Sequence, residues 1–196
     1  MDMDWIHKHR VWIVTHAPAF VMAIMLFVHP DFWKILTSYT GYTAVGFLAG
    51  VLSLNPLKAI FPRIVLLKRL NLYRQEFGVS CFTYATLHLI CFIIKRGSIS
   101  AMIPYLLHPA LMPVIFFAMP IFVVMTITST KGSLKKMGFQ KWKRLHRKVY
   151  FAEASVVLHM VLVGEKFWAA VLFTPLIIIQ LMRIVKNRSK SKLTSG

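Results

Sequence analysis

The sequence predicts an all-α integral membrane protein, a bundle of six transmembrane helices with both termini in the cytoplasm. Of its 196 residues, 57% are hydrophobic and the mean hydropathy is +0.63, whereas soluble domains are about 45–50% apolar. The apolar residues gather in six segments, each close to the roughly 20 residues that a membrane-spanning helix needs. The basic residues gather between these segments. These three observations exclude an ordinary soluble domain.

The six expected spans follow one another with short links, which leave no room for a separate soluble domain. They are residues 11–28, 42–61, 77–94, 109–127, 149–164 and 167–185. The transmembrane domain therefore covers 11–185, between a polar amino-terminal segment, 1–10, and a basic tail, 186–196. Without a nucleotide-binding domain, the chain is expected to be an electron-transfer subunit and not a complete NAD(P)H-oxidising enzyme.

Proline and glycine mark irregular points in two of the expected spans. The second span is expected to break at Asn55-Pro56, and Pro113 and Pro120 are expected to kink the fourth. Glycines early in the second span, such as Gly41, would let a neighbouring helix or a flat ligand approach the backbone closely.

The distribution of charge predicts the topology. The chain has 24 Lys and Arg against 6 Asp and Glu, a net charge of +18. With a cytoplasmic amino terminus and six spans, 20 of the basic residues lie in inner segments and 4 in outer loops. Positive charge is retained on the cytoplasmic side of membrane proteins, so both termini are expected there. The excess of positive charge is thus explained by the membrane topology, and we expect no nucleic-acid partner. The basic face is expected to attract anionic membrane lipid or an acidic electron donor.

The cysteines restrict how a cofactor could be attached. Cys81 and Cys91 are ten residues apart in one apolar segment, about 15 Å along a helix, too far for a disulfide within the chain. The sequence has no Cys-x-x-Cys-His motif, so any haem is expected to bind without thioether links.

Two histidines lie at matched depth in the third and fifth spans. His88 follows residue 77 by eleven positions and His159 follows residue 149 by ten, which places them about 16 Å and 15 Å into the membrane. Both spans run in the same direction, so the two imidazoles can bind one haem iron from opposite faces. The alternative is that each ring merely forms a hydrogen bond with a neighbouring polar group.

A third histidine, His146, precedes the fifth span by three residues among Lys and Arg. It is a candidate ligand of a second haem near the cytoplasmic face, or a solvated loop residue. If one helix joined it to His159, the two would lie about 220° apart around the axis, so the same face would not present both. The opposite ligand of a second haem would then be water, Gln75 or His16.

Two other polar residues admit functional roles but have simpler explanations. Glu153 lies about 6 Å into the fifth span, and an ion pair with a nearby Lys or Arg is favoured over proton uptake from a quinol. His108 precedes the fourth span and is expected to be an ordinary loop histidine.

Several short motifs resemble the MsrQ family, haem-binding membrane subunits of periplasmic methionine sulfoxide reductase systems within the ferric reductase-like transmembrane superfamily. The resemblance covers residues 10–185, and its most specific part is the Leu-His-x-x-Val-Tyr element with its spacing to the next histidine. The motifs are Thr40-Gly41, Asn55-Pro56-Leu57, Tyr84-Ala85-Thr86-Leu87-His88-Leu89, Thr128-Ser129-Thr130, Trp142-x-x-Leu145-His146-x-x-Val149-Tyr150 and Leu158-His159.

The resemblance implies a protein of the bacterial inner membrane that binds one or two b-type haems, with FMN also attributed to the family. His88, His146 and His159 match the family's haem histidines. Electrons would come from the quinone pool or a cytoplasmic flavin reductase. They would reach a periplasmic, molybdenum-containing methionine sulfoxide reductase subunit that repairs oxidised protein.

Two positions depart from the family's pattern, and two alternative functions stay open. His108-Pro109-Ala110 stands where Arg-Pro-Tyr is expected, and Tyr42 stands where a basic residue is usual. Both departures lie toward the outer side, where the periplasmic partner would dock. The alternatives are another ferric reductase-like haem protein with a different acceptor, and a transporter that uses membrane histidines as a proton relay.

Overall fold

The computed structural model describes residues 3–194, and the side chains of residues 9–187. Within this part every regular element is helical. The α-helices are α1 (Met3–Val28), α2 (Trp33–Ile60), α3 (Val65–Leu72), α4 (Arg74–Arg96), α5 (Ile99–Met102), α6 (Met119–Ile127), α7 (Lys131–Met137), α8 (Phe139–His146), α9 (Val149–Leu162) and α10 (Lys166–Thr194). Two 3₁₀ turns, η1 (Pro30–Phe32) and η2 (Ile103–Tyr105), and a π-helix, η3 (Pro113–Ala118), complete the list.

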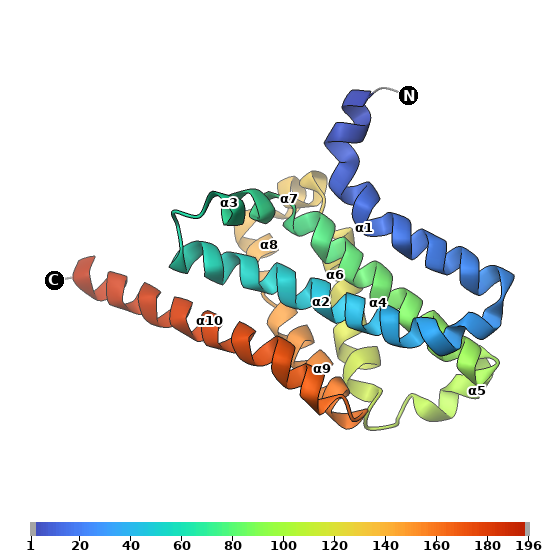
Figure 1. Cartoon of the computed structure of the whole chain (residues 1–196). Helices are drawn as coiled ribbons and strands as arrows, with labels where there is room; N and C mark the ends of the chain where they lie inside the picture. The colour runs from blue at the N-terminus through green and yellow to red at the C-terminus, as the bar shows by residue number, and fades with distance from the viewer. Residues whose placement is uncertain (1–2, 195–196) are drawn as a thin grey trace.

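The long helices form a bundle whose two ends differ (Figure 1). Helices α2 and α4 pack side by side at its centre, α1 lies on α4, α10 lies on α2, and α9 packs against η3. The short helices α3, α7 and α8 gather at the end from which both chain termini project, and α5 lies at the other end. The candidate cofactor ligands, His88 on α4 and His159 on α9, therefore lie within the bundle.

Four helical segments are long and apolar enough to span a membrane: His9–Val28, Pro30–Ile60, Arg74–Arg96 and Lys166–Asn187. A fifth candidate, Pro113–Ile127, continues after a 95° bend into α7. Helix α9 has 14 residues, about 21 Å of rise, shorter than a complete span. All six expected segments are thus helical, while the crossing of the membrane by all six stays a prediction.

The expected break at Asn55-Pro56 is wrong. Helix α2 continues through Pro56, which is fully buried, and ends at Ile60. The missing N–H of a proline costs one helical hydrogen bond, and tight packing of the ring in the core offsets this loss. Helix α4 ends at Arg96, because Gly97 follows it with a left-handed φ of 84° that glycine adopts without a steric penalty.

The two prolines of the fourth segment produce a π-helical segment where kinks were expected. Pro113 opens η3, and Pro120 follows its end. The backbone N–H of Met119 donates to Val114, five residues earlier, which is the wide spacing of a π-helix. Because Pro120 has no N–H, a regular four-residue hydrogen bond is lost at this point.

The single helix that would join His146 to His159 is interrupted. Helix α8 ends at His146 and α9 begins at Val149. The angular argument that assumed one continuous helix therefore does not apply, and the two histidines take their directions from different helices.

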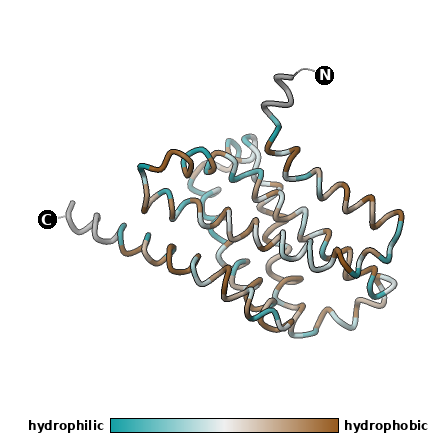
Figure 2. The backbone as a smooth tube through the Cα atoms, viewed as in Figure 1, coloured by the Kyte–Doolittle hydropathy of each residue, from teal (hydrophilic) through white to brown (hydrophobic). Residues whose placement is uncertain are grey.

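Packing and exposure both fit a lipid environment. The largest cluster of buried apolar residues joins α2, α4, η3, α6, α9 and α10, with Phe173 and Ala152 almost completely buried. Large apolar side chains face outward elsewhere, such as Phe27, which is 89% exposed, and Phe167, which is 70% exposed. Figure 2 shows hydrophobic residues along the long helices and hydrophilic stretches where α3, α7 and α8 gather. The outward apolar surface is what hydrocarbon would cover.

We expect a cysteine placed at Ser100 to react with an impermeant maleimide in intact spheroplasts. A cysteine at Lys135 should react only after lysis, because the basic segments stay inside. The parent protein is the control, since its Cys81 and Cys91 are buried. The opposite pattern of labelling would reverse the predicted topology.

Candidate functional site

His88 and His159 line one cavity at the centre of the bundle. Its volume is about 450 Å³, within the range of small-ligand pockets. Helices α2, α4, α6, α9 and the π-helix η3 contribute its walls, which are mainly apolar. The prediction that these two histidines meet is therefore supported by their position in the fold.

The ring of His88 is fixed by helix α2. Its Nδ1 lies 2.8 Å from the backbone oxygen of Thr37, and because a carbonyl only accepts, Nδ1 must carry the proton. The ring also lies against Gly41: a Cβ at that position would be 2.9 Å from Nδ1 and 3.0 Å from Cε1 of His88. The glycine thus leaves the space that the imidazole occupies.

The ring of His159 is fixed in the same way by the segment before η3. Its Nδ1 lies 2.6 Å from the backbone oxygen of Ala110. The backbone is irregular here, because Val114 donates to Leu111 and Pro113 has no N–H to donate. The carbonyl of Ala110 is therefore directed to the histidine and not to the next helical turn.

The two rings stand at a separation that suits one metal ion between them. Their centroids are 6.5 Å apart and their planes make an angle of 78°. With metal–nitrogen bonds of about 2.0–2.1 Å, imidazoles on opposite sides of a metal have centroids roughly 6–6.5 Å apart. Since both Nδ1 atoms are protonated donors, each Nε2 keeps the lone pair that binds a metal.

The end of the cavity away from α3, α7 and α8, which is the outer end in the predicted topology, is more polar than its centre. Ser38, Tyr42, Lys95 and Glu165 line it there, and the hydroxyl of Tyr42 donates to Oε2 of Glu165 at 2.7 Å. The two departures from the family's pattern both lie close to the cavity: Tyr42 lines it, and the backbone oxygen of Ala110 accepts a hydrogen bond from His159, which also lines it.

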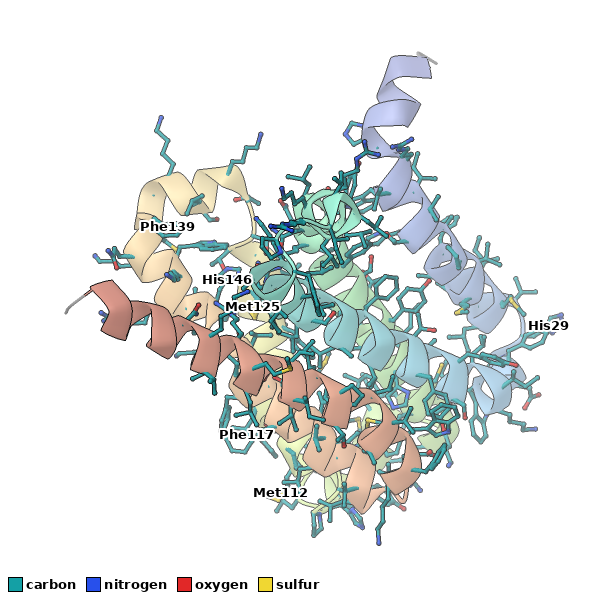
Figure 3. All side chains as sticks on the ribbon, turned by 60° about the vertical axis from the view of Figure 1, so that its left-hand side comes forward. His29, Met112, Phe117, Met125, Phe139 and His146 are labelled. Atoms are coloured by element: carbon teal, nitrogen blue, oxygen red, sulfur yellow. The ribbon has the colours of Figure 1, made fainter. Side chains whose placement is uncertain are left out.

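His146 lies apart from this cavity, at the end of α8. Figure 3 shows it beside Met125, at the end of the bundle opposite Met112. Its Nε2 forms a 3.1 Å hydrogen bond with the hydroxyl of Thr128, and its ring stacks on Trp142 with centroids 4.0 Å apart. It is therefore a packed side chain and not a freely solvated one.

The protonation of His146 follows from this packing. Burial lowers the pKa of His146, the positive charge of Arg74 lowers it further, and hydrogen bonding with Thr128 opposes these effects. The neutral imidazole is favoured at neutral pH, and it keeps a nitrogen lone pair that a cationic imidazole lacks.

The proposed partners of His146 in a second haem site are not assembled around it. His16 forms hydrogen bonds with Trp12 and Thr15 on its own helix, although its Nε2 is buried without a hydrogen-bond partner in the described part of the chain. Gln75 is exposed in the first turn of α4. Ligation of a second haem by His146 stays a prediction.

The expected ion pair of Glu153 is wrong. This buried carboxylate accepts hydrogen bonds from Nε2 of Gln180 on α10, at 3.2 Å to each oxygen. The salt bridge found among the described residues joins Lys34 to Asp31 instead. Membrane helices commonly satisfy a buried polar group with an amide from a neighbouring helix.

The structure is a bundle of long apolar helices in which two histidines face each other across one central cavity. The chain belongs to the family of ferric reductase like transmembrane components, which it matches over residues 40–157. It is a multi-pass membrane protein. The matched region includes His88 and His146 and ends two residues before His159.

The proteins to which this chain is similar in sequence have two different names. Magnetosome protein MamZ of Magnetospirillum gryphiswaldense is 31% identical over 135 residues, which cover 65% of this chain and 19% of MamZ. The protein-methionine-sulfoxide reductase heme-binding subunit MsrQ of Herminiimonas arsenicoxydans is 29% identical, over 64% of this chain and 57% of that protein. MsrQ of Brucella ovis is 27% identical, over 82% and 74%.

The chain thus spans about a fifth of MamZ and little more than half of the first MsrQ protein. No solved structure matches the chain significantly.

The sequence did not reveal the groups that orient the two histidines. The carbonyls of Thr37 and Ala110 leave no pattern of their own in a sequence, because every residue has a carbonyl. The available signals were indirect: the glycine at position 41 and the prolines at 109 and 113.

We expect Gly41→Ala to lower the amount of haem that the purified protein retains. The added Cβ would collide with the His88 ring and displace it from Thr37, a clash that costs about 1–3 kcal/mol. The measurement is Soret absorbance per protein. Gly46→Ala is the matched control, because nothing lies within 4 Å of a Cβ there and alanine favours a helix. Equal haem in both variants would contradict the role given to Gly41.

Proposed function

We propose that this chain is a b-type haem subunit of the bacterial inner membrane that carries electrons from the cytoplasmic side to a periplasmic acceptor. The observation that carries the proposal is the pair of imidazoles of His88 and His159, 6.5 Å apart across one cavity. Two neutral imidazoles with protonated Nδ1 atoms form a donor set that holds haem iron from both sides.

The surroundings of the two histidines fit a haem. The walls are largely apolar, Gly41 brings the backbone of α2 close to one ring, and the polar side chains lie at one end. A bound haem would supply a one-electron centre near the middle of the membrane. The chain's own contribution is to orient the imidazoles through Thr37 and Ala110 and to exclude water from the cavity.

The cytoplasmic side is the proposed point of electron entry. His146 lies there beside the charges of Arg74 and of the basic segments. Positive charge favours the reduced state of a nearby redox centre and attracts anionic groups, including a flavin phosphate and acidic lipid. We propose the quinone pool or a cytoplasmic flavin reductase as donor, with FMN or a second haem near His146 as the intermediate.

The proposed acceptor is a methionine sulfoxide reductase subunit, as the name of the MsrQ relatives suggests. We propose that it is periplasmic and contains molybdenum, as the resemblance of the motifs to this family implies. The similarity to MamZ favours a second candidate, a ferric reductase-like haem protein with another acceptor. Mixing the reduced protein with a purified periplasmic methionine sulfoxide reductase distinguishes them, because only the first candidate is reoxidised rapidly by it.

We expect His88→Ala and His159→Ala each to abolish the same haem, because either change removes one axial ligand of one iron. The measurement is the reduced-minus-oxidised spectrum of protein made with ample haem. His29→Ala is the control, since His29 lies in the link before η1, away from the cavity. Full low-spin haem in either variant would refute the pairing. A wild-type protein without reducible Soret and α bands would favour the proton-relay alternative.

We expect His146→Ala to keep the central haem but to lose either a second haem or the rate of its reduction. The reason is the position of His146 at the cytoplasmic end, between Thr128 and the Trp142 ring. Stopped-flow reduction by quinol or reduced flavin in membranes measures the rate. Trp142→Phe controls for lost packing, because it keeps an aromatic ring beside the histidine. Unchanged haem content and an unchanged rate would leave His146 with a structural role only.

A further inference from the structure

We propose that Lys95 orients the haem by binding a carboxylate of the porphyrin edge, so that this edge faces the outer end of the cavity. The inference rests on the proposed haem function and adds a positioning residue to it. It concerns a side chain to which neither the family match nor the sequence assigns a role.

Lys95 and His88 lie on the same face of α4. They are seven residues apart, which is two helical turns and about 10 Å of rise toward the outer end. Both side chains line the same cavity. The helix therefore presents one iron ligand at the middle of the cavity and one cation at its mouth.

Two groups of opposite charge line this cavity. Among the cavity-lining residues, Lys95 is the one Lys or Arg and Glu165 the one carboxylate. Glu165 accepts a hydrogen bond from Tyr42. Lys95 has its Nζ 5.5 Å from the centre of the Trp33 ring, a cation–π contact that leaves its charge available to an anion.

These two charges favour one orientation of a haem in the cavity, because the edges of a haem differ in charge. Haem b carries two carboxylates on one edge and apolar groups on the others. A carboxylate placed against the apolar walls would lose its hydration without a partner, at a cost of several kcal/mol. A carboxylate placed at Glu165 would be repelled. The edge that bears the carboxylates is therefore accommodated at Lys95.

The competing explanation is that Lys95 only extends its ammonium group to the membrane surface over Trp33. In that case its removal affects local packing but not the haem carboxylates. A test must therefore change the lysine and the carboxylates independently.

The first part of the test measures how fast the purified, full-length haem protein loses haem to excess apomyoglobin. We expect Lys95→Met to lose haem about fivefold faster, as removal of a partly exposed ion pair predicts, and Lys95→Arg to stay close to wild type. Lys34→Met is the matched control, because Lys34 is also an outer cation but pairs with Asp31 at 3.2 Å. An unchanged rate in Lys95→Met overturns the inference.

The second part repeats the measurement with haem dimethyl ester, loaded into protein made in haem-deficient cells. The ester keeps the iron and the porphyrin but has no carboxylate. The wild type and Lys95→Met should then lose the ester at the same rate. If Lys95→Met accelerates loss of haem and ester equally, the lysine acts through packing and the inference fails. If the wild type takes up neither compound, the proposed function itself fails, a result distinct from the other outcomes.

Discussion

The structure depends on one constraint, the need of two half-buried imidazoles in an apolar cavity to satisfy their Nδ1–H groups. No water is present in the hydrocarbon core to accept these protons, and an unpaired donor costs several kcal/mol there. Backbone carbonyls of Thr37 and Ala110 accept them. As a result each ring has one orientation and one tautomer, which leaves both Nε2 atoms as ligands.

The same constraint explains the irregular features around the cavity. Helix α2 is close to His88 because position 41 has no side chain. The segment before η3 is not a regular helix, so that its carbonyl at Ala110 reaches His159. The π-helix continues this departure from regular geometry. Such irregularities weaken individual helical hydrogen bonds, and they persist where surrounding packing and a function maintain them.

The bundle also differs between its two ends, as the proposed transfer of electrons across a membrane requires. Three short helices with many basic residues, α3, α7 and α8, cover one end, and His146 lies there. The central cavity is a separate site, where the hydrogen bond between Tyr42 and Glu165 links α2 to the segment just before α10. The candidate groups are thus arranged in sequence from one end to the other.

The sequence alone determined the helical membrane fold, because spans and their flanking charges are local features that hydropathy and charge reveal. It also placed His88 and His159 at matched depth, since depth along parallel helices can be counted at a fixed rise per residue, and the two rings do line one cavity. Their joint binding of a haem stays a prediction. Family motifs, now supported by the match over residues 40–157, pointed to the same histidines.

Only the tertiary structure decided how these residues meet. It replaced a continuous helix at His146 by two helices, carried α2 past Pro56, and gave Glu153 an amide partner from α10 where a cation was expected. It also placed Lys95 on the wall of the cavity that His88 and His159 line. These outcomes depend on contacts between helices that are distant in the chain. Such contacts are set by packing and by available hydrogen-bond partners, which no local pattern of residue types records.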